Sequence, residues 1–248
     1  MKPVLILQHM ASDSPGYFGT WLKRQGIPAV VANAGAGESF PSSMEPYAAL
    51  AILGGAMSAN DDLPYLRQGE ALIRQAMDTG RPVIGHCLGG QLMSKALGGC
   101  VTASPAPEVG WQPFTVKDSD MAREWFPAHL VTPVMHWHYE SFSLPAQSQW
   151  LASSSACPHQ AFCVGPHLAM QFHIEIDAEK LAVWMQEESD TWSRAQRAFP
   201  GSVQGREDIL ARATSLMQAH HALADHIYAH WWRGCPFLEI SPYEISVS

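Results

Sequence analysis

Residues 82–98 read PVIGHCLGGQLMSKALG, and this stretch joins an apolar strand to an amphipathic helix. Val83 and Ile84 are β-branched, whereas apolar residues recur at helical spacing from position 88 to position 97. Cys87 therefore falls on the corner between strand and helix, flanked by Gly85 and Gly89 in the pattern G-x-C-x-G. Small residues on both sides let strand and helix pass close together. The pattern predicts a nucleophile elbow in which the nucleophile is a cysteine.

The first turn of this helix gives Cys87 two further properties. The positive end of a helix that begins at Leu88 favours the thiolate form of the sulfur. The backbone N–H of Leu88 can also receive the oxyanion that forms when the sulfur attacks a carbonyl group. Alternatively, Cys87 is a small buried apolar residue, as most unpaired cysteines are. The two flanking glycines favour the reactive thiol.

Composition bounds the class of protein. The chain has 248 residues, 47% hydrophobic and 15% charged, which suits one α/β domain or one domain with an appendage. The net charge is -8 and the basic residues are scattered, so we expect a small-molecule or protein partner rather than nucleic acid or an anionic membrane. No apolar run approaches the roughly 20 residues that span a bilayer. Five cysteines without a regular framework and no secretory signal predict a cytoplasmic protein without cofactor.

The first hundred residues alternate between strands and helices. Strands are predicted at residues 4–7, 27–31 and 48–53, followed by the strand of the elbow. A helix at 14–22 separates the first two strands, and a helix at 61–77 separates the third strand from the elbow. This order implies a mostly parallel central sheet covered by helices on both faces. Ligands of such sheets bind beyond the carboxyl ends of the strands. Gly54-Gly55 and Cys87 both lie at such ends.

The pattern changes after residue 99. Shorter strands, interrupted by proline and glycine, are predicted at about 108–116, 131–137, 149–156, 160–165 and 168–173, with a helix near 121–125. We expect a partly antiparallel second half of the same domain. Asp177 is predicted to cap one helix that continues to Pro200-Gly201, and a second long helix should span 206–233. The two helices are expected to pack on the sheet as a hairpin.

A thiolate that attacks an amide needs a base, and the base needs a group that orients it. Residues 171–175 read QFHIE and supply both. His173 and Glu175 are two residues apart at the end of a strand, so their side chains leave on one face and the carboxylate can accept a hydrogen bond from the imidazole. A surface polar pair is the alternative. Together with the elbow, His173 and Glu175 are the best candidates in the chain.

Five motifs give the chain a family resemblance: GHCLGGQ at 85–91, QFHIE at 171–175, GGAMS at 54–58, EVGW at 108–111 and HWHYESFSLP at 136–145. The chain resembles the class I glutamine amidotransferases, in particular the stand-alone group similar to the amidotransferase domain of GMP synthase. The resemblance implies a flavodoxin-like three-layer α/β fold. It covers residues 1–180, so we expect an amidotransferase-like domain over 1–180 and a C-terminal helical extension over 181–248 packed on the same domain.

The resemblance also implies roles for individual residues. Cys87 is the nucleophile, His173 the base and Glu175 the orienting carboxylate. The backbone N–H groups of Gly55 and Leu88 form the oxyanion hole. The residues that hold a glutamine-like substrate are Gln91, Gly110, Trp111 and His138. Ile174, Gly90, Ala56 and Glu140 depart from the family's usual residues, which leaves the shape of the substrate pocket open.

No metal site is predicted. Histidines and cysteines crowd residues 136–173, but no pair has a Cys-x-x-Cys or His-x-x-x-His spacing. His136 and His138 alternate with Trp137 on a predicted strand, so they face one way and line either the active-site cleft or a half-exposed strand edge.

Three functions remain open. The first is hydrolysis of the γ-amide of glutamine or a γ-glutamyl compound through a cysteine thioester, with the ammonia passed to a synthetase partner or released. The second is a free-standing γ-glutamyl peptidase that acts on a conjugate. The third is a non-catalytic relative that binds a ligand or partner. The two C-terminal helices favour a self-sufficient enzyme, with a homodimer left open.

Overall fold

The computed structural model describes residues 1–187 and 189–236. The strands are β1 Val4–Gln8, β2 Ala29–Asn33, β3 Ala49–Ile52, β4 Val83–His86, β5 Val101–Gln112, β6 Thr115–Val116, β7 Val134–Phe142, β8 Gln149–Ser153, β9 Ala161–Val164 and β10 His167–Met170. The helices are α1 Gly16–Arg24, α2 Pro64–Asp78, α3 Leu88–Ala96, α4 Asp120–Trp125, α5 Ala178–Trp184, α6 Asp190–Ala198 and α7 Arg206–Arg233.

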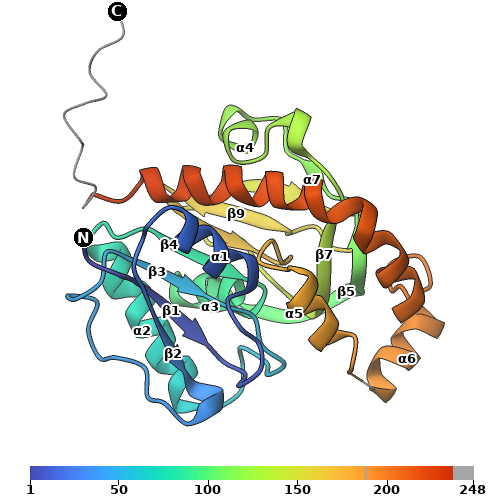
Figure 1. Cartoon of the computed structure of the whole chain (residues 1–248), viewed down its shortest axis with the longest axis horizontal. Coiled ribbons are helices and arrows are strands. Elements are labelled where there is room, and N and C mark those ends of the chain that lie inside the picture. Colours follow the sequence, from blue (N-terminus) through green and yellow to red (C-terminus); the bar gives the residue numbers. More distant parts are fainter. Residues whose placement is uncertain (188, 237–248) are drawn as a thin grey trace, which may run out of the picture.

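An eight-stranded sheet runs through the molecule in the order β2-β1-β3-β4-β10-β9-β8-β6 (Figure 1). The strands from β2 to β10 pair in parallel. The strands β9, β8 and β6 extend the sheet with antiparallel pairs. The predicted mostly parallel sheet with an antiparallel second half is therefore confirmed. Because β4 lies between β3 and β10, the residue that follows β4 sits at the middle of the sheet edge.

Side chains of the parallel strands alternate between two cores. In β1, Val4 and Ile6 belong to the core on the side of α1 and α7, whereas Leu5 and Leu7 belong to the core on the side of α2 and α3. Figure 1 shows α7 running across one face of the sheet, with α1 on the same side. Strands buried on both faces are the reason that these segments are continuously apolar. The fold is the expected three-layer arrangement.

Two strands of the second half lie outside the large sheet. Strand β5 pairs with β7 in a separate antiparallel sheet, and its register shifts between Ala103 and Glu108. The predicted strand at 108–116 is therefore wrong in extent, since β5 begins at Val101 and residues 115–116 form the separate strand β6. Pro105 and Pro107 lie in the irregular stretch, and proline cannot donate a hydrogen bond to a partner strand.

The C-terminal helices agree only in part with the prediction. The Asp177 side chain caps α5, as expected, but α5 ends at Trp184. The Ser189 side chain then accepts from the N–H of Trp192 and starts α6, so the single helix predicted from Asp177 to Pro200 is wrong. Helix α7 has the predicted bounds. Its C-terminal half, including Ile227, is buried in the same core as α1, so this chain's own sheet covers that apolar face.

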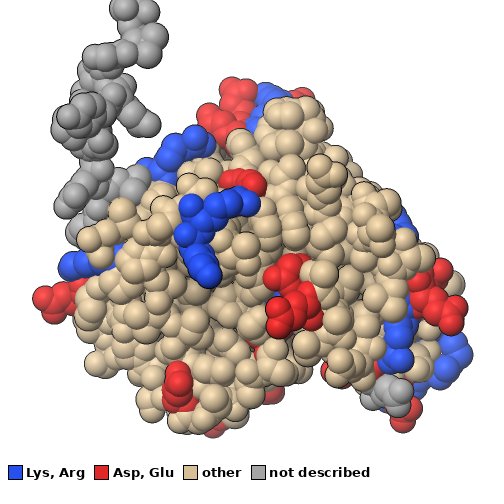
Figure 2. Space-filling model, viewed as in Figure 1, with Lys and Arg blue, Asp and Glu red and all other residues tan. Residues whose placement is uncertain are grey.

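Within residues 1–187 and 189–236 no helix combines the length and the apolarity needed to cross a membrane. On the face drawn in Figure 2, lysine and arginine side chains are dispersed among acidic and uncharged residues and form no continuous basic patch.

Candidate active site

Cys87 occupies the corner between β4 and α3 with a φ of 50° and a ψ of -107°. Among the described residues it is the one non-glycine residue with positive φ. Such a conformation costs on the order of 1–3 kcal/mol and persists only where the surrounding structure enforces it. The backbone N–H of Cys87 donates to the Met170 carbonyl at 2.9 Å, which ties the corner to β10.

The two glycines of the elbow allow strands and helix to approach closely. A Cβ on Gly85 would lie 2.5 Å from the carbonyl carbon of Gly89, and a Cβ on Gly89 would lie 2.3 Å from the carbonyl oxygen of Ile52. Both distances are shorter than real Cβ contacts, so neither position tolerates a side chain. The reason for the G-x-C-x-G pattern that the sequence suggested is therefore visible in the packing.

The structure brings Cys87, His173 and Glu175 together. Nδ1 of His173 lies 2.6 Å from Oε1 of Glu175, and Cys87 lines the same cavity as His173. A Cβ on Gly54 would lie 2.8 Å from Cε1 of His173 and 3.7 Å from Cβ of Cys87, so both side chains stand beside this glycine. The three side chains are buried, with Cys87 6% exposed. The N–H of His173 donates to the Met135 carbonyl at 2.8 Å, which fixes the segment after β10 against β7. Cys87, the imidazole and the carboxylate thus form one contiguous series of side chains.

Burial and charge oppose each other in this series. Burial alone would lower the pKa of His173, but the Glu175 carboxylate and the hydrogen bond with Cys87 outweigh it and raise that pKa to about 10. Burial alone would raise the pKa of Glu175, but the charge of His173 holds it well below its ordinary value. Both shifts favour the charged forms of the pair, an imidazolium and a carboxylate.

A cavity of about 400 Å³ opens beside the cysteine. Its lining includes Cys87 and His173 and three residues that the family resemblance implied, namely Gly55, Gln91 and His138. The side chain of Gln91 donates to the backbone carbonyl of Glu140 at 3.1 Å. A Cβ on Gly55 would lie 2.5 Å from the Met57 sulfur and 2.9 Å from Cδ2 of Leu88, so a side chain at this position would have to displace those two side chains.

Gly110 and Trp111 do not line this cavity. The Trp111 side chain is fully buried and its indole N–H donates to the Ile209 carbonyl at 3.1 Å. A Cβ on Gly110 would lie 2.3 Å from the Gln204 side chain, whose amide bonds with the Trp111 backbone. These residues hold the start of α7 against β5, so the structure does not support the prediction that they contact substrate.

The sequence model of glutamine amidotransferase class-I matches residues 29–183. A glutamine amidotransferase-like protein of Salmonella typhimurium is 32% identical over 201 residues, which are 78% of this chain and 84% of the relative. This chain belongs to the class-I glutamine amidotransferase family. The crystal structure of a glutamine amidotransferase from Methylobacillus flagellatus is 36% identical, with a TM-score of 0.86 over 95% of this chain and 96% of that one. A GMP synthase (glutamine-hydrolyzing) subunit of Thermoplasma acidophilum is 28% identical over 138 residues, 55% of this chain and 67% of the relative.

The amidotransferase cavity has an aromatic wall that the sequence did not indicate. The Trp184 ring stands edge-on to the His173 ring, with centroids 4.7 Å apart at an angle of 84°. The Trp184 indole donates to Asp13 at 2.7 Å, and Asp13 is also paired with the buried Lys180 at 2.6 Å. These contacts join residues more than 160 positions apart, so no local pattern reports them. Helix α5 thereby closes one side of the cavity.

A second group that the sequence did not indicate lies behind Glu175. Nε2 of the fully buried His86 is 4.0 Å from Oε2 of Glu175 and 3.3 Å from the hydroxyl of Tyr228 on α7. Nδ1 of His86 lies 3.4 Å from the Ile52 carbonyl and so carries the proton, which leaves Nε2 to accept from Tyr228. Burial lowers the pKa of His86, in agreement with a neutral ring. Helix α7 thus contacts the histidine that faces Glu175.

Proposed function

We propose that this protein hydrolyses the γ-amide of glutamine or of a γ-glutamyl compound through a thioester on Cys87. The observation that carries the proposal is the strained Cys87 on its elbow, in the same cavity as a His173 that Glu175 orients. A nucleophile, a base and an orienting group in hydrogen-bonded series are the requirement for acyl transfer.

The steps follow from this geometry. The Cys87 thiolate attacks the γ-carbonyl carbon and forms a tetrahedral intermediate. His173 gives its proton to the leaving nitrogen, the C–N bond breaks, and ammonia or an amine departs from the γ-glutamyl thioester. His173 then takes a proton from a water molecule that attacks the thioester, and glutamate leaves with Cys87 restored. Glu175 keeps the imidazole oriented and stabilises its positive charge in each step.

We assign the oxyanion hole to the backbone N–H groups of Leu88 and Gly55. Leu88 is the first residue of α3, where a backbone N–H has no acceptor within the helix. Gly55 lines the cavity at the carboxyl end of β3. Two such donors, fixed in place before the reaction, stabilise the charge that develops on the carbonyl oxygen. Gln91, which also lines the cavity, is the proposed polar contact of the amino-acid end of the substrate, and the His138 ring forms part of the adjoining cavity wall.

We further propose that residues 1–180 form the amidotransferase-like domain and that the described part of the C-terminal extension, residues 181–187 and 189–236, completes it. Residues 188 and 237–248 of the predicted extension lie outside the described residues. Trp184, Glu187 and Thr191 line the cavity, and Tyr228 reaches the group behind the triad. A homodimer is not required to cover α7, whose apolar face packs on this chain's sheet. The similarity to the GMP synthase subunit of Thermoplasma acidophilum supports a synthetase partner as the alternative. Because the reaction needs a reduced thiol, we place it in the cytoplasm.

A γ-glutamyl peptidase activity has one observation in its favour. Trp137 and Trp184 add aromatic surface to the cavity lining, which suits a substituent on the γ-nitrogen. Glutamine itself carries no such substituent.

The test is release of glutamate and ammonia by the purified full-length chain from glutamine, compared with release of glutamate and amine from γ-glutamyl dipeptides. We expect hydrolysis of at least one substrate class by the protein alone, and no activity of Cys87→Ala. Hydrolysis that begins only after a synthetase is added would show that the protein depends on that partner. Full activity of Cys87→Ala would refute the thioester mechanism. Inactivity of the wild type on every substrate would favour the third hypothesis, a non-catalytic protein that binds a ligand or partner.

A further inference from the structure

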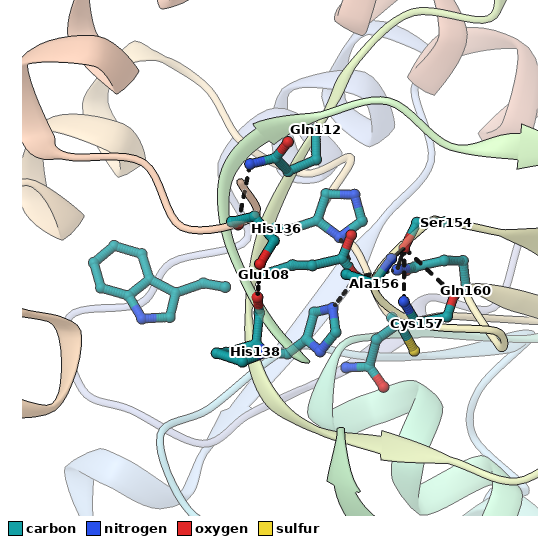
Figure 3. Close-up of polar contacts among 12 residues, drawn as sticks. Glu108, Gln112, His136, His138, Ser154, Ala156, Cys157 and Gln160 are labelled. Atoms are coloured by element: carbon teal, nitrogen blue, oxygen red, sulfur yellow. Dashed lines mark hydrogen bonds and ion pairs between the residues drawn. The ribbon is translucent and has the colours of Figure 1, made fainter. Parts of the chain in front are cut away.

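Three chemistry-bearing side chains gather on one face of the small sheet. Glu108 on β5 stands directly opposite His138 on β7, and His136 is two residues from His138 on the same strand. Side chains two apart on a strand share a face, and opposite residues on antiparallel strands lie next to each other. Figure 3 shows the two imidazoles on either side of the Glu108 side chain. The three residues are at most 3% exposed.

Their potential ligand atoms lie close together. Oε2 of Glu108 is 3.0 Å from Nε2 of His138 and 4.0 Å from Nδ1 of His136, and the three atoms lie within 4.8 Å of one another. Neither ring nitrogen of the fully buried His136 has a hydrogen-bond partner among the described residues. A buried polar group without a partner costs free energy. A ligand bound between Nδ1 of His136 and Glu108 would remove this cost.

The hydrogen bonds of His138 point the same way. Its Nδ1 lies 3.2 Å from the backbone carbonyl of Glu140, which can only accept, so Nδ1 carries a proton. Nε2 of His138 faces Oε2 of Glu108 at 3.0 Å. The imidazole nitrogen and the carboxylate oxygen thus meet at a point where either a proton or a metal ion can lie between them.

We propose that Glu108, His136 and His138 bind one Zn²⁺ ion. Two imidazoles and one carboxylate are ligands that zinc prefers, and bonds of about 2.0–2.2 Å place ligand atoms of a tetrahedral site roughly 3.4 Å apart. Side-chain shifts on the order of 1 Å therefore convert the observed spacing into a coordination sphere, with water as the fourth ligand.

The surroundings of His138 and Glu108 fit such a site, whereas Nε2 of His136 has no partner among the described residues. Metal-bound histidines usually donate their other ring N–H to a backbone carbonyl, and metal-bound carboxylates are themselves hydrogen-bonded. His138 donates from Nδ1 to the Glu140 carbonyl, and Gln160 donates to Oε2 of Glu108. The spacing rules of sequence analysis could not find this site, because its ligands come from two strands 28 or more positions apart.

Binding would stiffen one wall of the cavity without entering the reaction. His138 lines the cavity, and the Glu140 carbonyl that accepts its N–H also accepts from Gln91.

The experiment uses the full-length chain, stripped with a chelator and titrated with Zn²⁺ and with Co²⁺. We expect one ion per chain and, for Co²⁺, visible absorption bands of a tetrahedral site with nitrogen and oxygen ligands. His136→Phe should weaken binding by at least about 10-fold, and Glu108→Gln should do the same. His220→Phe is the matched control, since His220 is also buried and has no partner on either ring nitrogen among the described residues.

Equal affinity and stoichiometry of the wild type and both ligand variants would overturn the proposal. Absence of binding to the wild type would also overturn it, and a proton rather than a metal ion would then lie between His138 and Glu108. If circular dichroism shows that a variant fails to fold, the Co²⁺ spectrum of the wild type is the test, and bands of a tetrahedral site with nitrogen and oxygen ligands support the proposal. Sulfur-to-cobalt charge-transfer bands would place the ion on a cysteine and refute the proposed ligands.

Discussion

At the scale of single residues, the geometry assigns unequal weight to the two partners of Cys87. In the proposed mechanism His173 transfers the proton, whereas Glu175, 2.6 Å from its Nδ1, orients and stabilises His173. We therefore expect His173→Asn to lower kcat/KM by about 10²–10⁴-fold, the range that positioned proton transfer supplies. Glu175→Gln should cost less, because the imidazole remains. Steady-state rates of both variants on the best substrate test this order, and equal, negligible effects would remove both residues from the mechanism.

Gly54 offers a steric test of the same ring. A Cβ at this position would lie 2.8 Å from Cε1 of His173, so Gly54→Ala should push the imidazole away from Cys87. We expect a loss of kcat on the order of 10²-fold, as misplacement by about 1 Å produces elsewhere. Gly201→Ala is the matched control, because no heavy atom lies within 4 Å of its Cβ. A Gly54→Ala enzyme with the kcat of the control would mean that the ring position is not critical.

Some of these residue roles could be read from the sequence and others could not. The elbow is a local pattern, and its two glycines have a local steric cause, so the sequence alone could single out Cys87 as a candidate. His173 and Glu175 are two positions apart, so a local pattern could single them out as well. Trp184 and Asp13 meet only in the folded chain. Trp111 shows the opposite failure, since a motif match placed it near substrate and packing against α7 buries it instead.

At the scale of elements, α7 supports the triad from behind. The Tyr228 hydroxyl lies 3.3 Å from Nε2 of His86, which in turn faces Glu175. Tyr228→Phe removes one hydrogen bond worth about 0.5–1.5 kcal/mol, so we expect kcat to fall by up to about 10-fold while KM changes little. Tyr47→Phe, which packs on the α2 and α3 side of the sheet, is the control. Unchanged kcat in Tyr228→Phe would show that α7 only covers the core.

The C-terminal helices also show that apolar residues at helical spacing do not reveal a break between two helices. Trp184, Met185 and Trp192 fit one helical face, so the pattern continues across the break between α5 and α6. The signal that could have located the break is Ser189-Asp190, a capping residue followed by an acidic first turn. The bounds of α7 were predictable because its apolar spacing is long and ends at Gly234.

At the scale of the whole molecule, buried histidines set the response to acid. Burial lowers the pKa of His9 and His167 to about 4 and that of His220 to about 3, and it also lowers the pKa of His86. Unfolded histidines bind protons below about pH 6.5, whereas these remain neutral in the fold, so each destabilises the protein as pH falls below that value. The expected loss is about 1.4 kcal/mol per pH unit for each histidine.

Urea unfolding between pH 7.5 and pH 4.5 measures this slope. In His220→Phe the free energy of unfolding should depend less steeply on pH, by about 1.4 kcal/mol per pH unit, because one proton fewer is taken up on unfolding. His173 acts in the opposite sense, since its raised pKa gives stability that is complete below about pH 6.5 and declines as pH rises toward 10. A pH-independent free energy of unfolding below pH 6.5 would contradict the buried, neutral state of these rings.

The central claim is that the reaction passes through a γ-glutamyl thioester on Cys87, and peptide mass mapping after acid quench during turnover tests it most directly. We expect a γ-glutamyl adduct that hydroxylamine removes, on the peptide that carries Cys87, and a greater amount of it in a variant such as Glu175→Gln if deacylation is slowed more than acylation. The exposed Cys100 is the internal control and should stay unmodified. An adduct on Cys100 alone, or continued hydrolysis by Cys87→Ala, would contradict the account.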